Sequence, residues 1–454
     1  MPHAATSFAT PLIVKVAYDL GGVSSSEDAG GNSPFLRPEN MVHHTMPTSN
    51  TPAPSASKII KVMGWGTAAV MCSLIVGSLG GCTSSPTQAP VEDRTPAAST
   101  TQAPAAPAVV VIAPPKVETG QTIVQARSRW VGVGWDALPG LQQDALGQGW
   151  RAWIKSCERR ATMPPALATL CPQALALANA DAASQRAWMF RHLQPYRVES
   201  LQGESQGLLT AYYEPIFEAS RTPNTHFNAP MYAPPTGLAS RKPWYTRKEM
   251  DTLAEAKAAL KGRALAYLAD PVDAMVLQIQ GSGRIRVQQA DGSYRTSRLA
   301  FAGTNEQPYK SVGKWLLDQG LTKDATWPGI KAWLARNPQR QQALLWSNPR
   351  MVFFREEALS DSDTDAGPRG AQGVALTAGG SIAVDPGSIP YGTPVWISSN
   401  GAQTQLQQLV IAQDTGSAIT GAVRADYFAG SGAQAGELAG RLKQPLQMWV
   451  LWPK

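Results

Sequence analysis

The most informative part of the sequence is LVIAQDTGSAITGAVRADYF, residues 409–428. Its apolar start is typical of a buried strand that ends at Asp414, where Thr-Gly-Ser forms a turn. Asp426 follows twelve positions later, flanked by Arg424 and by the aromatic Tyr427 and Phe428. An aspartate before such a turn commonly caps its own backbone, whereas a carboxyl group beside aromatic rings is desolvated and suited to proton transfer. Tyr427 and Phe428 could supply such an environment for Asp426.

Further motifs lie on both sides of this stretch. Small residues follow it at Gly430, Gly432, Ala435 and Gly436, and matching segments precede it at residues 207–215, 232–235, 276–287, 301–310 and 348–354. Together they resemble the membrane-bound lytic murein transglycosylase A family, which carries a domain with three aspartates. The segments are widely separated and ordered as in that family, so the resemblance is more specific than any single motif.

The residues alone predict a mixed, mostly β protein of two domains with a helical N-terminal part. The resemblance implies more: a double-psi β-barrel domain with a second, barrel-like β-rich domain inserted into it, and a groove between the two. We expect residues 121–202 to be the helical part of the barrel domain, 203–357 the insert and 358–454 the three-aspartate barrel.

Several secondary-structure elements can be predicted from the residues alone. The segment 207–214 is a strand stopped by Pro215, and 276–287 alternates as two strands around a glycine kink. Helical spacing runs over 138–155, and a second helix begins at Pro172 and carries Trp188 and Phe190.

The resemblance also implies the reaction. Such enzymes cleave the β-1,4 bond between N-acetylmuramic acid and N-acetylglucosamine in peptidoglycan without water and leave a 1,6-anhydromuramyl end. When the substrate's own 6-hydroxyl attacks, the reaction is intramolecular, and one carboxyl group can act first as acid and then as base. Asp426 matches that catalytic position, while Asp414 and Asp385 match the other two aspartates and are expected to support the site's geometry. The resemblance suggests exolytic action without a cofactor or metal.

Candidates for substrate contact lie in two of the matching segments. Tyr212 and Tyr213 offer rings for stacking on sugars, and Thr210, Gln280 and Ser282 offer hydrogen bonds to acetamido and hydroxyl groups. Because side chains alternate along a strand, at most one of the two tyrosines should face the groove.

The N-terminal region is typical of an exported protein. Residues 58–81 combine two lysines with an apolar stretch and end in Leu-Gly-Gly before Cys82, which resembles a lipoprotein signal with Cys82 as the lipidated residue. A transmembrane anchor with an incidental cysteine is the alternative. Cys82 is followed by Thr83 and not by the aspartate that retains enteric lipoproteins at the inner membrane. The resemblance therefore suggests a position at the periplasmic face of the outer membrane. Residues 82–120 are expected to form a disordered linker rich in Pro, Ala and Thr, and 1–57 fit no signal region, which suggests a start at Met41 or Met46.

Cys157 and Cys171 lie at the expected facing ends of two helices. An oxidising periplasm would allow a disulfide between them, and two free buried thiols are the alternative. No histidine joins the pair at the spacing of a metal site.

The formal net charge of +7 is mild, and no basic run is typical of a nucleic-acid groove. An exported basic protein meets the anionic cell wall, so the expected partners are peptidoglycan glycan strands and the outer membrane, with cell-wall synthase complexes as further candidates and a monomeric state. Two other functions stay open. A cell-wall-binding lipoprotein without catalysis would keep the fold, and an aspartic peptidase is suggested by the tetrad Asp-Thr-Gly-Ser at Asp414.

Overall fold

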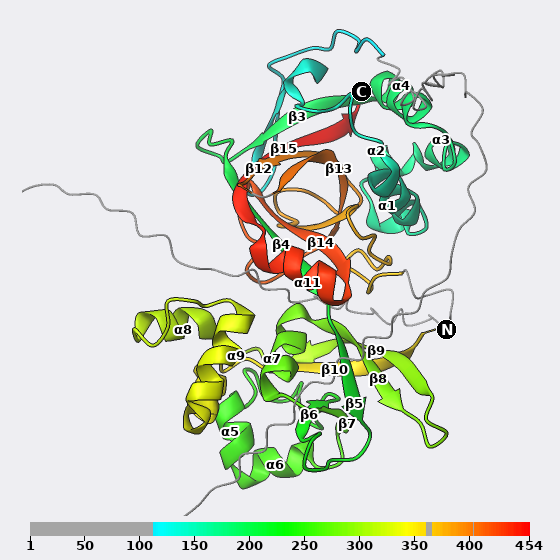
Figure 1. Cartoon of the computed structure of the whole chain (residues 1–454). Coiled ribbons are helices and arrows are strands. Elements are labelled where there is room, and N and C mark those ends of the chain that lie inside the picture. Colours follow the sequence, from blue (N-terminus) through cyan, green and yellow to red (C-terminus); the bar gives the residue numbers. More distant parts are fainter. Residues whose placement is uncertain (1–111, 360–365, 403) are drawn as a thin grey trace, which may run out of the picture. The chain divides into compact units, whose positions relative to one another are not determined.

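A computed structural model describes residues 112–359, 366–402 and 404–454 of the chain (Figure 1). The predicted N-terminal extension, the signal segment, Cys82 and most of the linker lie outside these residues. Within the described part, no helix combines the length and the apolar character that crossing a membrane requires.

The larger of two sheets has nine strands, and six of them close into a ring. The order is β1-β2-β3-β15-β12-β13-β11-β14-β4, and β4 also pairs with β15, so that β15, β12, β13, β11, β14 and β4 form a barrel (Figure 1). Two pairs in the ring are parallel, β11 with β13 and β4 with β14. The strands are β1 (Thr122–Val124), β2 (Arg129–Gly132), β3 (Leu193–Glu199), β4 (Gly207–Glu214), β11 (Ser381–Val384), β12 (Pro394–Asn400), β13 (Gln405–Asp414), β14 (Arg424–Ser431) and β15 (Lys443–Pro453).

Aliphatic side chains from every strand of the ring fill its interior. They belong to one buried cluster, which includes Leu209, Ile382, Ile397, Val410, Ala425 and Met448. Since side chains alternate along a strand, their neighbours point to the outer face of the barrel. The interior is therefore a packed core, and any site on these strands lies on the outer face.

Helices cover part of that outer face. They are α1 (Gly147–Cys157), α2 (Pro165–Ala168), α3 (Cys171–Ala176) and α4 (Ala182–His192), with 3-10 turns at Trp135–Ala137 and Arg160–Thr162. Trp150, Trp153 and Trp188 meet edge to face, with ring centroids 5.2 to 5.6 Å apart. They pack in one cluster with Leu409 and Ile411 of β13. The helical layer thus stabilises the strand that carries Asp414.

Two predictions about these helices are wrong in extent. Helix α1 begins at Gly147, not near Leu138, because the residues before it form turns and Leu146 adopts a left-handed conformation with φ of 58°. The helix predicted from Pro172 to Phe190 is two helices. The carboxylate of Asp181 accepts a hydrogen bond from the Ser184 N–H at 2.7 Å, which caps a new helix after α3 has ended.

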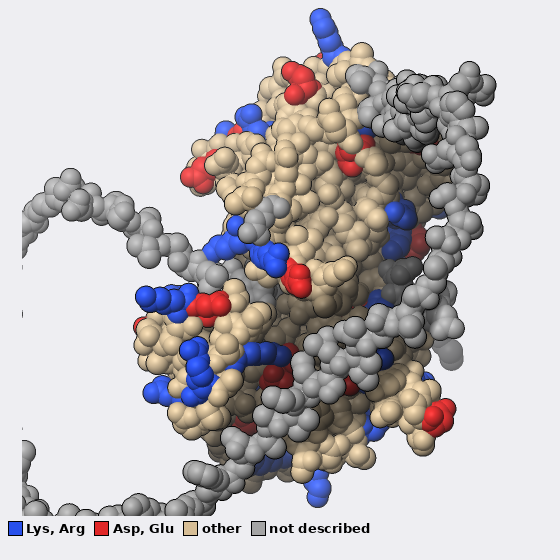
Figure 2. All heavy atoms as spheres, viewed as in Figure 1, with Lys and Arg blue, Asp and Glu red and all other residues tan. Residues whose placement is uncertain are grey.

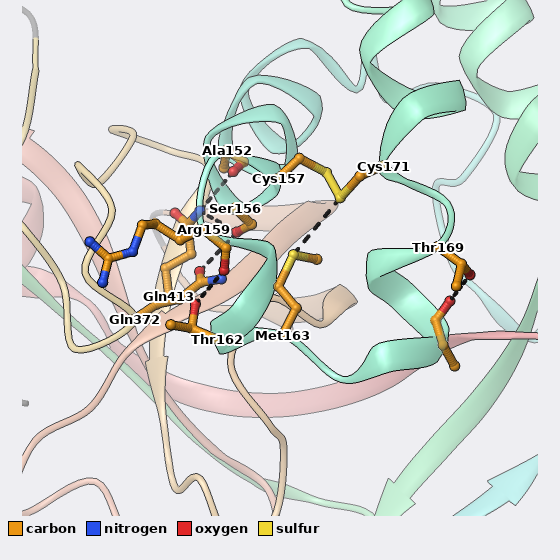
Figure 3. Close-up of a disulfide and its surroundings, with 11 residues drawn as sticks. Ala152, Ser156, Cys157, Arg159, Thr162, Met163, Thr169, Cys171, Gln372 and Gln413 are labelled. Atoms are coloured by element: carbon orange, nitrogen blue, oxygen red, sulfur yellow. Dashed lines mark hydrogen bonds between the residues drawn. A yellow bond between two sulfur atoms is a disulfide. The ribbon is translucent and has the colours of Figure 1, made fainter. Parts of the chain in front are cut away.

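A disulfide joins the end of α1 to the start of α3 (Figure 3). The Sγ atoms of Cys157 and Cys171 lie 2.08 Å apart and their Cα atoms 5.5 Å apart. Next to it, Ser156 Oγ accepts a hydrogen bond of 2.7 Å from Gln413 Nε2, which also donates to the Ala152 carbonyl (Figure 3). The bridged end of α1 therefore contacts the residue that directly precedes Asp414.

The second sheet has the order β10-β9-β8-β5-β7-β6. Its strands are β5 (Ile216–Ser220), β6 (Ala229–Tyr232), β7 (Ala264–Leu268), β8 (Ser282–Gln288), β9 (Tyr294–Thr304) and β10 (Val352–Ala358). The helices of this region are α5 (Arg247–Thr252), α6 (Ala254–Leu260), α7 (Pro271–Gln280), α8 (Val312–Asp318), α9 (Trp327–Arg336) and α10 (Gln341–Ser347), with a 3-10 turn at Pro338–Arg340. A separate apolar cluster fills this region, and α7 contributes much of it.

The prediction of two strands over 276–287 is wrong in its first half. Residues 276–280 end helix α7, which Asp270 caps by accepting a 2.8 Å hydrogen bond from the Val272 N–H, with Pro271 in the first turn. Gly281, with φ of 75°, ends the helix and β8 starts at Ser282. Helix α7 is buried on most sides, so its sequence lacks the polar face that distinguishes a helix from a strand.

The crossing between the sheets comes later than the expected boundary at residue 203. The strand predicted at 207–214 is present as β4, but it pairs with β14 and β15 and so belongs to the barrel. The chain enters the second sheet after Pro215, where β5 begins. Helix α11 (Gly432–Arg441) follows β14 and packs against β4 and β14.

Charged side chains do not form a single stripe on the face drawn in Figure 2. There, lysines and arginines are interspersed with aspartates and glutamates over the described surface (Figure 2).

Candidate active site

Asp414 and Asp426 lie on the same outer face of the barrel, on either side of β11. Ala383 of β11 is the cross-strand partner of both, in parallel register with Asp414 and in antiparallel register with Asp426. Residues directly paired across strands point to the same face. Both aspartates are fully buried. Around them lies a small apolar cluster of Tyr212, Leu376, Ala383, Ile419 and Phe428.

A β-bulge brings Asp414 to this face. Ile382 pairs with Ala412 while the next residue, Ala383, pairs with Asp414, so β13 has one extra residue, Gln413, at this point. Without the extra residue, the alternation set by Val410 and Ala412 would point Asp414 into the barrel interior. Bulges commonly re-aim side chains next to active sites. The hydrogen bonds between Gln413 and α1 hold this one in place.

Asp426 is hydrogen-bonded through a hydroxyl group on the neighbouring strand. Thr210 Oγ1 donates to Asp426 Oδ1 at 2.5 Å, and Arg424 Nη2 donates to Thr210 Oγ1 at 2.9 Å. Thr210 and Asp426 are direct partners in the parallel pair β4–β14. Phe428, two residues along β14, packs its ring on Tyr212 with centroids 5.2 Å apart. Asp426 thus accepts a hydrogen bond from Thr210 at Oδ1, and the Tyr212 and Phe428 rings lie on the same face of the strand pair.

Asp414 anchors a tyrosine and a loop. Its Oδ2 accepts a hydrogen bond of 2.9 Å from the Tyr212 hydroxyl, and its Oδ1 accepts one of 2.9 Å from the Ala371 N–H. Burial raises the pKa of Tyr212 well above its usual value, and the charges of Asp414 and Asp426 raise it further. The Tyr212 hydroxyl therefore keeps its proton and remains a donor to Asp414.

Asp385 lies just after β11 and holds backbone together. Its carboxylate accepts hydrogen bonds from the N–H groups of Gly387 at 2.9 Å and Gly421 at 2.8 Å, and from Arg127 Nη1 at 3.1 Å. It thereby ties the turn after β11 to the loop that leads into β14. Asp385 and Asp414 engage different donors, unlike the paired aspartates of aspartic peptidases, which share one proton.

The residues predicted to contact substrate divide into two groups. Thr210 and Tyr212 lie beside the aspartates and are bonded to them. Tyr213 points to the opposite face of β4, where its ring lies against Gly436 of α11, and its backbone N–H donates to Gln280 Oε1 at 3.1 Å. Gln280 ends α7 and Ser282 begins β8, and both are buried. The alternation expected for the two tyrosines is therefore present.

The chain was compared with known proteins. The MltA specific insert domain matches residues 208–355 and the 3D domain matches residues 380–452. Membrane-bound lytic murein transglycosylase A of Vibrio cholerae is 30% identical over 264 residues, which cover 55% of this chain and 67% of that protein. This chain belongs to the membrane-bound lytic murein transglycosylase A family.

Solved structures agree with this placement. Lytic transglycosylase LtgG of Burkholderia pseudomallei is 40% identical, and the match covers 76% of this chain and 100% of that one with a TM-score of 0.53. MltA from Neisseria gonorrhoeae is 28% identical and has a TM-score of 0.62, over 74% of this chain and 96% of that one. All three aspartates of this transglycosylase A family member fall inside the 3D match. The insert match includes nearly all of β4, although that strand hydrogen-bonds within the barrel.

Sequence reasoning missed a further buried carboxylate in this family member. Glu214, at the end of β4, accepts hydrogen bonds from Arg284 Nε at 2.8 Å, Arg298 Nε at 2.5 Å and Ser431 Oγ at 2.9 Å. Both guanidinium groups also donate to the Ala366 carbonyl, at 3.0 and 2.6 Å. The alternation of Arg284 and Arg286 with apolar residues was visible in the sequence, but their distant partner was not.

Three other residues near the aspartates were also missed. Arg424 was noted only as a basic neighbour of Asp426, and Ala383 and Tyr391 were not singled out. Burial raises the pKa of Tyr391 to about 12, and the charges of Asp414 and Asp385 act in the same direction. Among the described residues, no group of three or more His, Cys, Asp or Glu side chains is placed to hold a metal ion.

Proposed function

We propose that this lytic transglycosylase cleaves the β-1,4 bond between N-acetylmuramic acid and N-acetylglucosamine in peptidoglycan with Asp426 as its single acid and base. The observation that carries the proposal is the setting of Asp426. It is buried beside the Tyr212 and Phe428 rings, on one face with Asp414, and Thr210 fixes the orientation of its carboxyl group.

The proposed reaction needs two proton transfers. Asp426 gives its proton to the glycosidic oxygen as the bond to C1 of N-acetylmuramic acid breaks. The resulting carboxylate takes the proton of the 6-hydroxyl of the same sugar as that oxygen bonds to C1, so a 1,6-anhydro ring forms and Asp426 ends as it began. No water is consumed. Holding the 6-hydroxyl near C1 makes the attack intramolecular, which replaces the second carboxylate of a hydrolase.

Asp414 has a supporting role in this proposal. Both of its oxygens accept hydrogen bonds, one from Tyr212 and one from the Ala371 backbone. It therefore positions the tyrosine that forms the wall beside Asp426. Asp385 supports the same site from further away, because it holds the loop that leads to β14 through Gly421.

Gln280 and Ser282, which were predicted to contact substrate, suggest a path for the glycan strand. We assign the glycan strand to a groove between the barrel and the insert, where Gln280 reaches the backbone of β4 and Ser282 begins β8. The closed ring of six strands with its two parallel pairs supports assignment of the barrel to the double-psi class.

Membrane attachment belongs to the same proposal. Homologues are named membrane-bound, and Leu-Gly-Gly-Cys82 fits lipidation at Cys82 and a position at the outer membrane. Cells fed a labelled fatty acid should label the parent protein but not its Cys82→Ala variant. Equal labelling of both would contradict the anchor.

The central test is mass spectrometry of the muropeptides that the protein releases from purified sacculi, compared with its Asp426→Asn variant. Anhydromuramyl products that disappear in the variant are the expected result. Reducing-end products would mean that water attacks and that a second carboxylate takes part. Products no greater than the blank from the parent would instead support a binding protein without catalysis.

A further inference from the structure

We propose that Arg424 and Thr210 form a positioning relay that confines the catalytic proton of Asp426 to Oδ2. The proposal rests on the function proposed for Asp426 and extends it to two residues that do not themselves react. Neither residue is needed to contact sugar for this role.

Arg424, Thr210 and Asp426 are linked by consecutive hydrogen bonds. Arg424 Nη2 donates to Thr210 Oγ1 at 2.9 Å, and Thr210 Oγ1 donates to Asp426 Oδ1 at 2.5 Å. Arg424 stands two residues before Asp426 on β14, so the two side chains lie on the same face of the strand. Arg424 Nη1 also donates to the carbonyls of Leu208 and Ala425, which fixes the guanidinium group between β4 and β14.

The donor and the acceptor of each hydrogen bond in the relay are fixed by chemistry. A guanidinium group in a protein is always protonated and can only donate, so Thr210 Oγ1 must accept from Arg424. The single hydroxyl proton of Thr210 is then directed to Asp426 Oδ1. Because Oδ1 accepts this bond in both protonation states of Asp426, the acidic proton resides on Oδ2. The same oxygen would deliver the proton to the leaving group and take it back from the 6-hydroxyl.

The relay also affects how readily Asp426 ionises. The charged and titratable groups on the strands around Asp426 include Arg424 on β14, Tyr212 on β4, Asp414 on β13 and Lys443 on β15, the cross-strand partner of Thr210, with Asp385 just after β11. Arg424 is the cation that donates to Thr210, and the polarised Thr210 hydroxyl transmits its effect. A hydrogen bond to the ionised form favours that form. Breaking the relay should therefore make Asp426 harder to ionise and displace its titration to higher pH.

Four variants test the relay: Thr210→Val, Thr210→Ser, Arg424→Gln and the double variant Thr210→Val with Arg424→Gln. Valine keeps the shape of threonine without the hydroxyl, and serine keeps the hydroxyl. We expect Thr210→Val and Arg424→Gln each to lower kcat by about 10- to 100-fold on purified glycan strands, the scale of proton-transfer catalysis, with little change in KM. Thr210→Ser should restore most of the rate.

The pH profile and the double variant give readouts that a merely structural role would not change. The acid form of Asp426 starts the reaction, so activity falls as pH rises through its pKa. In Thr210→Val and Arg424→Gln this alkaline limb should move up by roughly one pH unit. Because both residues act through one path, the double variant should lose about as much as either single variant.

Several outcomes overturn the relay. Thr210→Val with the rate and pH limb of the parent would show that the hydroxyl does not position Asp426. Multiplied losses in the double variant would show two independent effects. If Arg424→Gln fails to fold by circular dichroism, Thr210→Val and Thr210→Ser still decide. An active Asp426→Asn variant would refute the proposed function itself, whereas an inactive one with unaffected Thr210→Val refutes only the relay.

Discussion

The parallel pair β4–β14 carries two buried carboxylates that are held in different ways. Asp426 pairs with Thr210, and a hydroxyl group stands between its carboxylate and Arg424. Glu214 pairs with Ser431 and meets Arg284 and Arg298 directly. Direct guanidinium contacts balance a buried charge and fix it in place. A hydroxyl group between guanidinium and carboxyl group orients the carboxyl group and still allows the carboxyl group to exchange its proton. The same strand pair thus holds one carboxylate for chemistry and one for architecture.

The largest predicted effect is a loss of turnover when Asp426 is replaced. Asp426→Asn should lower kcat by about 10²- to 10⁴-fold, because the amide cannot give or take the proton. Thr210 can still donate to the amide oxygen, so the midpoint of urea unfolding should stay close to that of the parent. Both are measured on one preparation, by product release from sacculi and by urea titration. If the variant lost stability as well as activity, Asp426 would also have an architectural role and would not differ from Glu214.

Glu214→Gln should show the reverse pattern. It replaces the carboxylate that two buried guanidinium groups contact with a neutral amide, which costs about 3–5 kcal/mol of the free energy of unfolding. Urea unfolding followed by tryptophan fluorescence measures this loss. The matched control is Glu437→Gln on α11, whose partner Arg441 is 3.9 Å away with both side chains mostly exposed, and which should leave stability unchanged. Equal effects of the two substitutions would contradict the architectural role.

The disulfide gives a stability effect outside the strand pair. Replacing Cys157 and Cys171 by serine removes a link across 14 positions and should cost about 3 kcal/mol of unfolding free energy. Turnover at low temperature should hold, since the hydrogen bond that orients Asp426 comes from Thr210 on β4. A thiol reductant should destabilise the parent by a similar amount and leave the serine variant unaffected. A variant as stable as the parent would show that the link does not stabilise the fold.

The smallest effect concerns the anchor of Asp414. Tyr212→Phe removes the donor to Asp414 Oδ2 and should cost about 1–3 kcal/mol of unfolding free energy. The folded protein raises the pKa of Tyr212, so the parent binds this proton more tightly when folded and loses stability as pH rises above about 10. Tyr212→Phe should show a shallower decline than the parent over that range. Identical alkaline slopes would contradict the raised pKa of the buried Tyr212 hydroxyl.

The sequence was informative where chemistry and local pattern coincide. The strand before Asp414, the strand at 207–214 and the family itself could all be inferred from residue types and their spacing. The bulge at Gln413 could not, because strict alternation from Val410 places Asp414 inside the barrel. Helix α7 was misread because a helix buried on most sides has no polar face to reveal its period.

Functional contacts between distant segments were beyond local patterns. Thr210 was predicted to contact sugar because it lies in a segment that resembles the family, and this stays a prediction. The hydrogen bond from its hydroxyl to Asp426, which lies 216 positions away, was not foreseen. Glu214 meets Arg284 and Arg298 across 70 and 84 positions. Neither pairing leaves a trace in the spacing of the residues. They become visible only when the strand order is known.

The closure of the barrel by β4 also bears on how the chain folds during its synthesis. Strand β4 emerges long before β14 and β15, its two partners, and the whole insert lies between them. Such long-range pairing is intrinsically slow, because a large loop must close before the contacts form. Until then β4 presents an open strand edge, and a C-terminal fragment made alone would leave the edges of β14 and β15 unpaired. A factor that shields exposed strand edges would therefore act on this chain between the emergence of Gly207 and that of Lys443.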